Sequence, residues 1–341
     1  MSVLSSTDTR SDARLRDLHE WLAGRFGGNT FTLAPASVDA SFRRYFRITR
    51  DGKTSIAMDA PPPQEDCRPF VRIAVLLHAA GVHAPQVIAH DIERGYLLLS
   101  DLGTKTYLDI IDESNADELF RDATDALIKW QLASRPGVLP PYDDALLRRE
   151  MNLFPEWYVA RHLKREMTAA QQQVLPGAMD LLTAAALAQP KVYVHRDYMP
   201  RNLMASTPNP GVLDFQDAVY GPITYDVVSL FRDAFLSWPE ERVLDWSVRY
   251  WEKARAAHLP VRADFGDFWR DFEWMGLQRH LKVLGIFARI NYRDGKPHYL
   301  KDTPRFVGYV RAAAARYREF APLLKLFDEF ENLEAPAGYT F

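Results

Sequence analysis

Two clusters of ionisable residues stand a short loop apart in the middle of the chain. Residues 195–202 read HRDYMPRN and follow a strand-like apolar run, and residues 214–217 read DFQD and follow another. Asp197 has the chemistry to accept the proton of an attacking hydroxyl. Asn202 and Asp214 offer the oxygen ligands that hold magnesium against nucleotide phosphates. The pattern therefore predicts a phosphoryl-transfer centre.

Each of these residues also has a purely structural interpretation. Asp197 and Asp214 can cap turns, but the presence of His195, two strand-like runs and both clusters together argues against that for the set. His195 has no second histidine nearby at metal-ligand spacing, so we expect it to hydrogen-bond the backbone around Asp214 and not to bind zinc. Asp217 either binds a second ion or structures its loop, and the sequence leaves both open.

The elements that must position these clusters fall into two regions. Helical periodicity over Asp12–Phe26 ends at Gly27-Gly28. Beyond it, Asp51-Gly52 is a hairpin signal between two strand-like runs. The expected strands lie at 31–33, 45–49, 55–58, 85–90 and 95–100, with one helix at 66–80. Residues 30–100 are therefore predicted to form a small antiparallel sheet with one helix.

From about Leu102 onward helical patterns dominate. The expected helices lie at 115–134, 143–163, 168–188, 225–236, 239–257, 265–292 and 303–327. The prediction is an α+β protein with two lobes: a nucleotide-binding lobe over 1–100, a linker over 101–105, a helical catalytic and substrate lobe over 106–333, and a tail over 334–341.

Composition excludes several classes of protein. The 341 residues include 42 basic and 45 acidic side chains, a net charge of -3, which gives no reason to expect nucleic acid as a partner. The single cysteine, Cys67, excludes an internal disulfide and a zinc site built on thiolates. The first 22 residues lack the apolar core of a secretory signal, and no apolar run is long enough to cross a bilayer. We expect a cytoplasmic protein without a membrane partner.

The two clusters also carry a resemblance to a known family. Residues 195–202 followed by Val-Leu-Asp214-Phe-Gln-Asp217 resemble the aminoglycoside phosphotransferase/choline kinase family, which has a protein-kinase-like fold. The resemblance spans nearly the whole chain in lobe order. It implies that Asp197 is the catalytic base, that Asn202 and Asp214 bind Mg2+, and that ATP is the phosphoryl donor.

Within that family, several segments are similar to the bacterial anomeric kinases of N-acetylmuramate and N-acetylglucosamine. The segments are 41–47, 58–63, 65–70, 97–103 and 149–157. The similarity implies sugar 1-phosphate products and a place in peptidoglycan recycling. The alternatives are a kinase of the same fold acting on an aminoglycoside, choline or homoserine, and an inactive nucleotide-binding scaffold. The basic stretch 278–293 favours a neutral or anionic substrate over a cationic one.

The N-terminal region departs from a standard kinase pattern. Residues 34–41 stand where a glycine-rich loop is expected, and Met58 stands where a phosphate-pairing lysine is expected. Arg43, Arg44 or Arg47 can supply the missing charge, since arginine binds phosphate well, and Arg44 is the first choice. Ser41 is expected to lie near the phosphates. Leu97 and Leu99 are expected to line the adenine site next to the inter-lobe linker.

Four residues are candidates for binding the sugar: Glu150, Asn152, Trp157 and Arg289. Glu150 and Trp157 are seven residues apart on one expected helix and should share a face, so that the indole stacks on the sugar and the polar groups bind hydroxyls. The alternative is a core tryptophan beside solvent-facing acids. Arg289 can pair with the lactyl carboxylate of N-acetylmuramate. The alternative is that Arg289, like Arg279, His280 and Lys282, lies on a solvated helix face. The oligomeric state is not indicated, and a monomer is compatible with the sequence.

Overall fold

The chain folds into two compact units. The computed structural model describes residues 12–38 and 42–331. One unit comprises the chain up to Thr106 together with Leu203–Asp217, and the other comprises Tyr107–Asn202 and the chain from Ala218 onward. The predicted tail over 334–341 lies outside the described residues.

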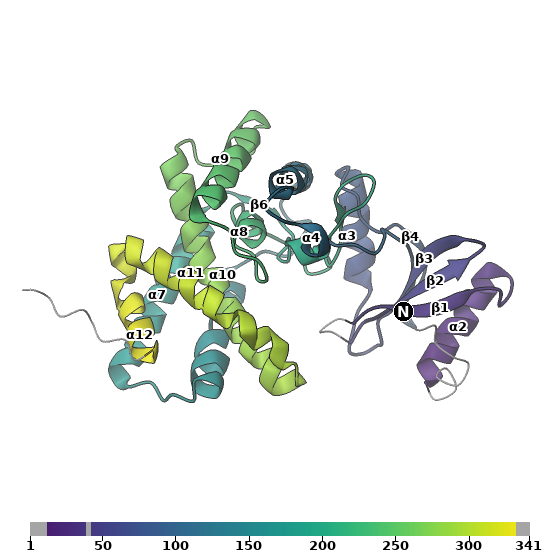
Figure 1. Ribbon diagram of the computed structural model, residues 1–341, viewed down its shortest axis with the longest axis horizontal. Coiled ribbons are helices and arrows are strands. Elements are labelled where there is room, and N and C mark those ends of the chain that lie inside the picture. The colour runs from purple at the N-terminus through teal and green to yellow at the C-terminus, as the bar shows by residue number, and fades with distance from the viewer. Residues whose placement is uncertain (1–11, 39–41, 332–341) are drawn as a thin grey trace, which may run out of the picture. The chain divides into compact units, whose positions relative to one another are not determined.

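The first unit is built on one antiparallel sheet with strand order β1-β2-β3-β5-β4 (Figure 1). Its elements are α2 (Ala13–Phe26), β1 (Thr32–Val38), β2 (Arg44–Arg50), β3 (Lys53–Asp59), α3 (Arg68–Ala79), β4 (Val87–Asp91), β5 (Tyr96–Ser100), β7 (Leu203–Met204) and β8 (Gly211–Val212). The predicted small antiparallel sheet is confirmed.

Local signals set the limits of α2. The Asp12 carboxylate accepts a hydrogen bond from the Leu15 amide at 3.0 Å, and Gly27 closes the helix in the left-handed conformation at φ 70°. The buried face of α2, which includes Leu18 and Leu22, packs in one apolar cluster with side chains of the sheet. Figure 1 shows α2 beside the strands. The helix expected over Asp12–Phe26 is thus confirmed, and its role is to cover one face of the sheet.

The hairpin between β2 and β3 turns where the sequence predicts. Asp51 and Gly52 both have positive φ, 50° and 72°, as a two-residue turn of this kind requires, and Arg50 pairs with Lys53 across it. Because this register is defined, the side chains of β2 alternate between the two faces of the sheet in a known phase.

The segment Leu203–Asp217, expected in the helical lobe, belongs to the first unit. β7 and β8 pair with each other as a short hairpin. The Ala205 amide donates to the Lys105 carbonyl at 2.9 Å, and the Val212 amide donates to the His83 carbonyl at 2.7 Å. β7 is not predictable from the sequence, because a strand of two residues has no periodicity to detect.

The second unit is mainly helical. Its elements are α4 (Tyr107–Ile110), α5 (Ala116–Leu132), α6 (Asp144–Met151), η1 (Phe154–His162), α7 (Ala169–Ala188), β6 (Lys191–Val194), η2 (Pro200–Asn202), β9 (Val219–Pro222), α8 (Tyr225–Phe231), α9 (Glu240–Ala256), α10 (Phe265–Asp294), η3 (Pro297–Asp302), α11 (Thr303–Arg316), η4 (Arg318–Phe320) and α12 (Ala321–Glu331). β6 and β9 form a two-stranded antiparallel pair.

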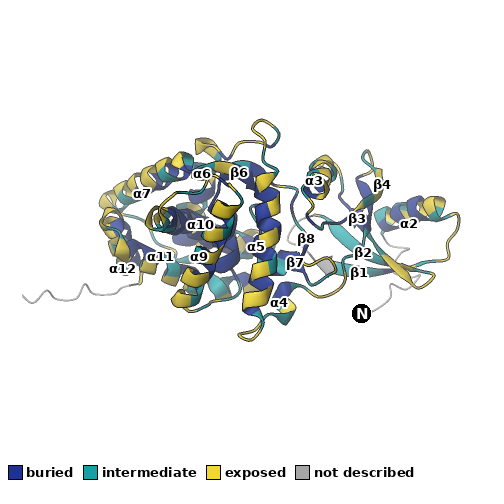
Figure 2. Ribbon diagram, turned by 90° about the horizontal axis from the view of Figure 1, so that it is seen from above, coloured by how far each residue is buried: buried dark blue, intermediate teal, exposed yellow. Residues whose placement is uncertain are grey.

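The 30-residue helix α10 is the centre of this unit. It starts at the Asp264 cap and ends at Gly295, which has φ 68°. Its apolar residues join those of η1, α7, α11 and α12 in one buried cluster. Around it the helices are amphipathic, and Figure 2 shows α5 with one buried and one exposed face.

Two helices expected to be continuous are broken. The helix expected over 143–163 divides into α6 and the π-helix η1, in which the Leu163 amide donates to the Tyr158 carbonyl five residues back. Pro155 has no amide hydrogen with which to continue α6. The helix expected over 303–327 ends as α11 because Tyr317 is extended (φ −115°, ψ 116°), and the chain resumes as η4 and α12.

None of the helices among residues 12–38 and 42–331 combines the length and apolarity needed to cross a membrane.

Candidate active site

Asp197 and Asn202 lie on one compact loop of the second unit. The loop leaves β6 and enters the 3-10 turn η2, which ends at Asn202. The Asn202 side chain donates from Nδ2 to the Asp197 carbonyl at 2.9 Å. The backbone N–H of Asn202 donates to the Met199 carbonyl at 2.8 Å. The five-residue spacing read from the sequence thus corresponds to a closed, hydrogen-bonded loop that relates the two residues directly.

A buried carboxylate, Asp226, holds the start of this loop. It accepts hydrogen bonds from the amides of His195 at 2.6 Å and Arg196 at 2.9 Å. Burial raises the pKa of Asp226 to about 7 despite the two amide donors, and the charge of Asp197 adds to the rise. Sequence reasoning missed Asp226, although an aspartate at the start of the apolar helix Tyr225–Phe231 was a signal that could have revealed it.

The next part of the loop is fixed by Tyr198. Its buried hydroxyl donates to the Ala123 carbonyl of α5 at 2.7 Å, and the His195 ring packs edge-on against it with centroids 5.5 Å apart. The Asp197 amide donates to Nδ1 of His195 at 3.3 Å. His195 therefore supports the loop that carries Asp197, and its expected hydrogen bond to the backbone around Asp214 stays a prediction.

Asp214 belongs to the first unit, directly after β8. Its backbone is left-handed, with φ 61°, and Gln216 Nε2 donates to its Oδ1 at 2.9 Å. Arg43 lies within electrostatic reach of both Asp214 and Asp217. Burial opposes ionisation of Arg43, but Tyr45, Glu65 and these two aspartates outweigh it and raise the arginine's pKa. Arg43, which also pairs with Glu65 at 3.2 Å, is thus a cation that acts on the Asp214 loop.

Asn202 and Asp214 each carry an oxygen atom that can bind a metal ion. In the part of the chain that the structure describes, no group of three or more His, Cys, Asp or Glu side chains can hold a metal ion. Asn202 uses its Nδ2 on the Asp197 carbonyl, so its carbonyl Oδ1 is the atom with ligand chemistry. An amide oxygen and a carboxylate are hard donors of the kind that divalent cations such as Mg2+ take.

The residues expected to bind the nucleotide divide between two faces of the sheet. Leu97 pairs with Met58 and Leu99 pairs with Ile56, so these four side chains share the face opposite to α2. Arg44 lies on the α2 face, in phase with Phe46 and Ile48. Arg44 therefore starts from the face of the sheet opposite to Leu97 and Leu99.

The contacts of Arg44 agree with this placement. Its guanidinium pairs with the buried Asp59 at 2.5 Å and with Asp12, the cap of α2. The arginine chosen first from the sequence thus ties α2 to β3, and the structure does not support it as the phosphate ligand. Arg47 lies on the other face but pairs with Asp101 at 2.6 Å. Ser41 lies outside the described residues.

Glu150, expected to bind sugar hydroxyls, is buried and already paired. Lys282 Nζ lies 3.0 Å from its Oε1, and Arg196 and the Tyr142 hydroxyl also bind the carboxylate. Burial opposes ionisation, but Lys282 and Arg196 outweigh it and lower the pKa of Glu150 to about 2. Both oxygens are thus engaged inside the protein, which does not fit the expected sugar-binding role.

The other expected sugar residues lie at the end of α6, in η1 and in α10. Asn152 is exposed at the end of α6, and Trp157 packs partly buried against the apolar cluster around α10. Because η1 is a π-helix, the seven-residue spacing of Glu150 and Trp157 does not place them on one helical face. Arg289 is partly buried, and its desolvation lowers its pKa.

Three basic residues in the middle of α10 are not solvated. Arg279, His280 and Lys282 are all buried. Arg279 acts electrostatically on the carboxylates of Asp226 and Asp233, and burial lowers the pKa of His280 well below its usual range. The polar middle of α10 therefore supports α8 and the Asp197 loop from within the core.

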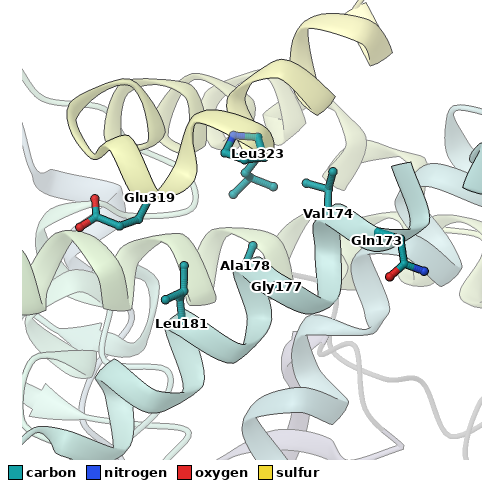
Figure 3. A pocket seen from close by; sticks show the side chains of 8 residues that line it. Gln173, Val174, Gly177, Ala178, Leu181, Glu319 and Leu323 are labelled. Carbon is teal, nitrogen blue, oxygen red and sulfur yellow. The ribbon is translucent and has the colours of Figure 1, made fainter. Parts of the chain in front are cut away.

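A cavity of about 320 Å3 lies elsewhere in the second unit, between α7 and the start of α12 (Figure 3). Val174, Leu181 and Leu323 give it an apolar lining, with Gln173 and Glu319 at its edges. Among the described residues, none of the expected site residues lines it.

An antiparallel sheet unit that carries Asp214, and a helical unit that carries Asp197 and Asn202, define a phosphotransferase with a protein-kinase-like fold. A choline kinase from Streptococcus pneumoniae has a similar structure, with a TM-score of 0.61 at 13% identity over 89% of this chain and 99% of that one. At this identity the likeness concerns the fold alone.

The model of the phosphotransferase enzyme family matches residues 32–268. The chain belongs to this family, and the enzyme class and fold expected from the sequence are confirmed. Among its relatives is an N-acetylmuramate/N-acetylglucosamine kinase of Pseudomonas putida, 57% identical over 94% of this chain and 97% of the relative. A kinase of the same name from Pseudomonas aeruginosa is 59% identical over 86% of this chain and 87% of the relative. Membership of a kinase family implies the use of ATP and a divalent metal ion.

Proposed function

We propose that the chain transfers the γ-phosphoryl group of ATP to the anomeric hydroxyl of N-acetylmuramate and N-acetylglucosamine. The products are the sugar 1-phosphates, and the reaction belongs to peptidoglycan recycling in the cytoplasm. The observation that carries the proposal is the 57% identity to a kinase named for these two sugars, over nearly the full length of both chains.

Asp197 is the proposed catalytic base. Its loop is held by Asp226 at one end and closed by Asn202 at the other, which supports a fixed direction for the carboxylate. A carboxylate so held can orient the acceptor hydroxyl and take its proton as the bond to phosphorus forms. The proton passes to Asp197, the sugar oxygen takes the phosphoryl group, and ADP leaves.

Asn202 Oδ1 and the Asp214 carboxylate are the proposed ligands of Mg2+. When bound, the ion neutralises the charge on the phosphate oxygens during transfer. Leu97 and Leu99 are proposed to line the adenine site. In place of Arg44 we propose Arg43 as the arginine that serves the phosphates, because it acts electrostatically on Asp214 and Asp217.

The test measures ADP release with MgATP and a panel of sugars for the wild type, Asp197→Asn and Asp214→Ala. We expect turnover with the two amino sugars and a loss of at least ~1000-fold in kcat for each variant. Wild-type turnover by Asp197→Asn would refute the assignment of the base. Nucleotide-induced thermal stabilisation without turnover on any sugar would instead indicate a nucleotide-binding scaffold.

A further inference from the structure

Arg196, the residue before Asp197, has an unusual backbone for its type. Its φ is 78°, in the left-handed region that favours glycine, and an arginine there is strained. Such strain persists only where the surroundings hold the residue in place. Two sets of contacts do so here, one to the backbone and one to the side chain.

The backbone contact is the buried carboxylate of Asp226, which accepts the Arg196 amide at 2.9 Å. The side-chain contact is Glu150, which is itself buried between cations. Lys282 Nζ lies 3.0 Å from Glu150 and donates to the Tyr225 hydroxyl at 2.8 Å. The Arg196 guanidinium therefore ends in a site whose other members come from α6, α8 and α10.

Asp197 adds a further negative charge to the surroundings of this cluster. Arg196 and Lys282 bring two positive charges, and Glu150 brings one negative charge. Asp197 lies within electrostatic reach of both cations and is the further carboxylate that acts on each of them. The cluster thus connects by charge, as well as by the chain, to the residue that follows Arg196.

We propose that Arg196 is a positioning residue for Asp197, and that Glu150 and Lys282 form the buried anchor that holds its side chain. Fixing the side chain of Arg196 fixes the left-handed backbone, and this sets the direction in which Asp197 leaves the loop. The inference rests on the proposed function, because it assumes that Asp197 is the base. It gives Glu150 and Lys282 a role in turnover without contact to the substrate.

The same unit contains a matched control. Glu273 is also a buried glutamate held by two cations and a tyrosine: Arg232 at 3.1 Å, Arg316, and the Tyr317 hydroxyl at 2.8 Å. Among the described residues, none of these partners belongs to the Asp197 loop. Glu150→Gln and Glu273→Gln therefore remove the same charge from similar surroundings. Only Glu150 binds a residue of the Asp197 loop, Arg196.

The experiment measures kcat, KM for ATP and melting temperature for Glu150→Gln, Arg196→Gly, their double variant and Glu273→Gln. Glycine at 196 accepts the left-handed backbone without strain but cannot be anchored. We expect Glu150→Gln and Arg196→Gly each to lower kcat about tenfold or more, with KM for ATP within about twofold. The double variant should be no slower than the slower single variant, because both break one interaction. Glu273→Gln should lower the melting temperature and keep kcat.

Wild-type kcat in Arg196→Gly would overturn the proposal, and so would an equal loss of kcat in Glu273→Gln. If Glu150→Gln fails to fold, Arg196→Gly decides alone. The Asp197→Asn variant shows whether the positioning role of Arg196 or the proposed catalytic role of Asp197 is wrong. Loss of turnover in Asp197→Asn with normal turnover in Arg196→Gly overturns only the anchor, whereas normal turnover in Asp197→Asn removes the base itself.

Discussion

Replacing Glu150 with glutamine should destabilise the second unit strongly and in a pH-dependent way. The carboxylate is buried between Lys282 and Arg196, and its pKa falls from the usual 4.5 to about 2. A shift of that size corresponds to about 3 kcal/mol, at 1.36 kcal/mol per pH unit. Removing one partner of a buried ion pair costs a similar amount, about 3–5 kcal/mol, because the remaining cations lose their counter-charge.

The sign of the pH dependence follows from the lowered pKa. The Glu150 carboxyl has a pKa of about 2 in the folded protein and about 4.5 in the unfolded chain. Its stabilisation is therefore fully present above pH 4.5 and is lost as the pH falls towards 2. The difference between the wild type and Glu150→Gln should therefore shrink from about 3 kcal/mol at pH 7 to roughly 1 kcal/mol at pH 3.

Differential scanning calorimetry measures this difference. For a unit of this size, about 3 kcal/mol corresponds to a fall of about 6–12 °C in melting temperature at pH 7. Glu118→Gln is the surface control: Glu118 pairs with Arg121 at 3.4 Å in an exposed position, so its loss should cost less than about 1 kcal/mol. A melting temperature for Glu150→Gln within about 2 °C of the wild type, or a difference that does not shrink at low pH, would refute the reasoning.

Two further perturbations test the first unit. Arg43→Met should raise KM for ATP about tenfold or more. Arg44→Met should leave KM for ATP within about twofold and lower the melting temperature, because Arg44 ties Asp59 to α2. Equal effects of the two variants on KM would contradict the choice of Arg43 over Arg44. Gly95→Ala should destabilise the unit by at least ~3 kcal/mol, because the added Cβ would lie 1.9 Å from the Ala60 carbonyl oxygen. Gly52 has a similar φ but open space around it, so Gly52→Ala should cost about 1 kcal/mol. Urea unfolding measures the free energy of unfolding of both glycine variants. Equal decreases would show that the positive φ, and not the clash with Ala60, causes the destabilisation.

Features encoded by neighbouring residues could be predicted from the sequence. The caps of α2 at Asp12 and Gly27, and the turn at Asp51-Gly52, depend on a few adjacent side chains and on φ. The loop from Asp197 to Asn202 is equally local, since its closing hydrogen bond spans five residues. The small antiparallel sheet and the helical remainder followed from these signals and from periodicity.

Contacts between distant residues could not be predicted. Asp226 follows His195 by 31 positions, and Lys282 follows Glu150 by 132, so the fold alone brings these partners together. A charged residue on a long helix is ordinarily solvent-facing, which is why the sequence suggested a solvated face for α10. In the structure these charges are buried because Glu150 and Asp226 provide counter-charges inside the core.

The choice among the arginines failed for a different reason. Arg43 and Arg44 are adjacent, and which of them faces the nucleotide side depends on the phase of β2 against β3. The Asp51-Gly52 turn sets that phase, but no local signal shows which face of the sheet α2 covers. The break of the expected 143–163 helix at Pro155 had a visible cause, but the π-helix that follows it did not.

The central claim is transfer of a phosphoryl group from ATP to the anomeric oxygen of an N-acetylated amino sugar. The most direct test incubates the protein with MgATP and N-acetylmuramate and identifies the product by phosphorus and proton NMR. We expect a sugar 1-phosphate, in which the anomeric proton couples to phosphorus. Phosphate on any other oxygen, or no phosphorylated sugar while the protein binds ATP, would contradict it.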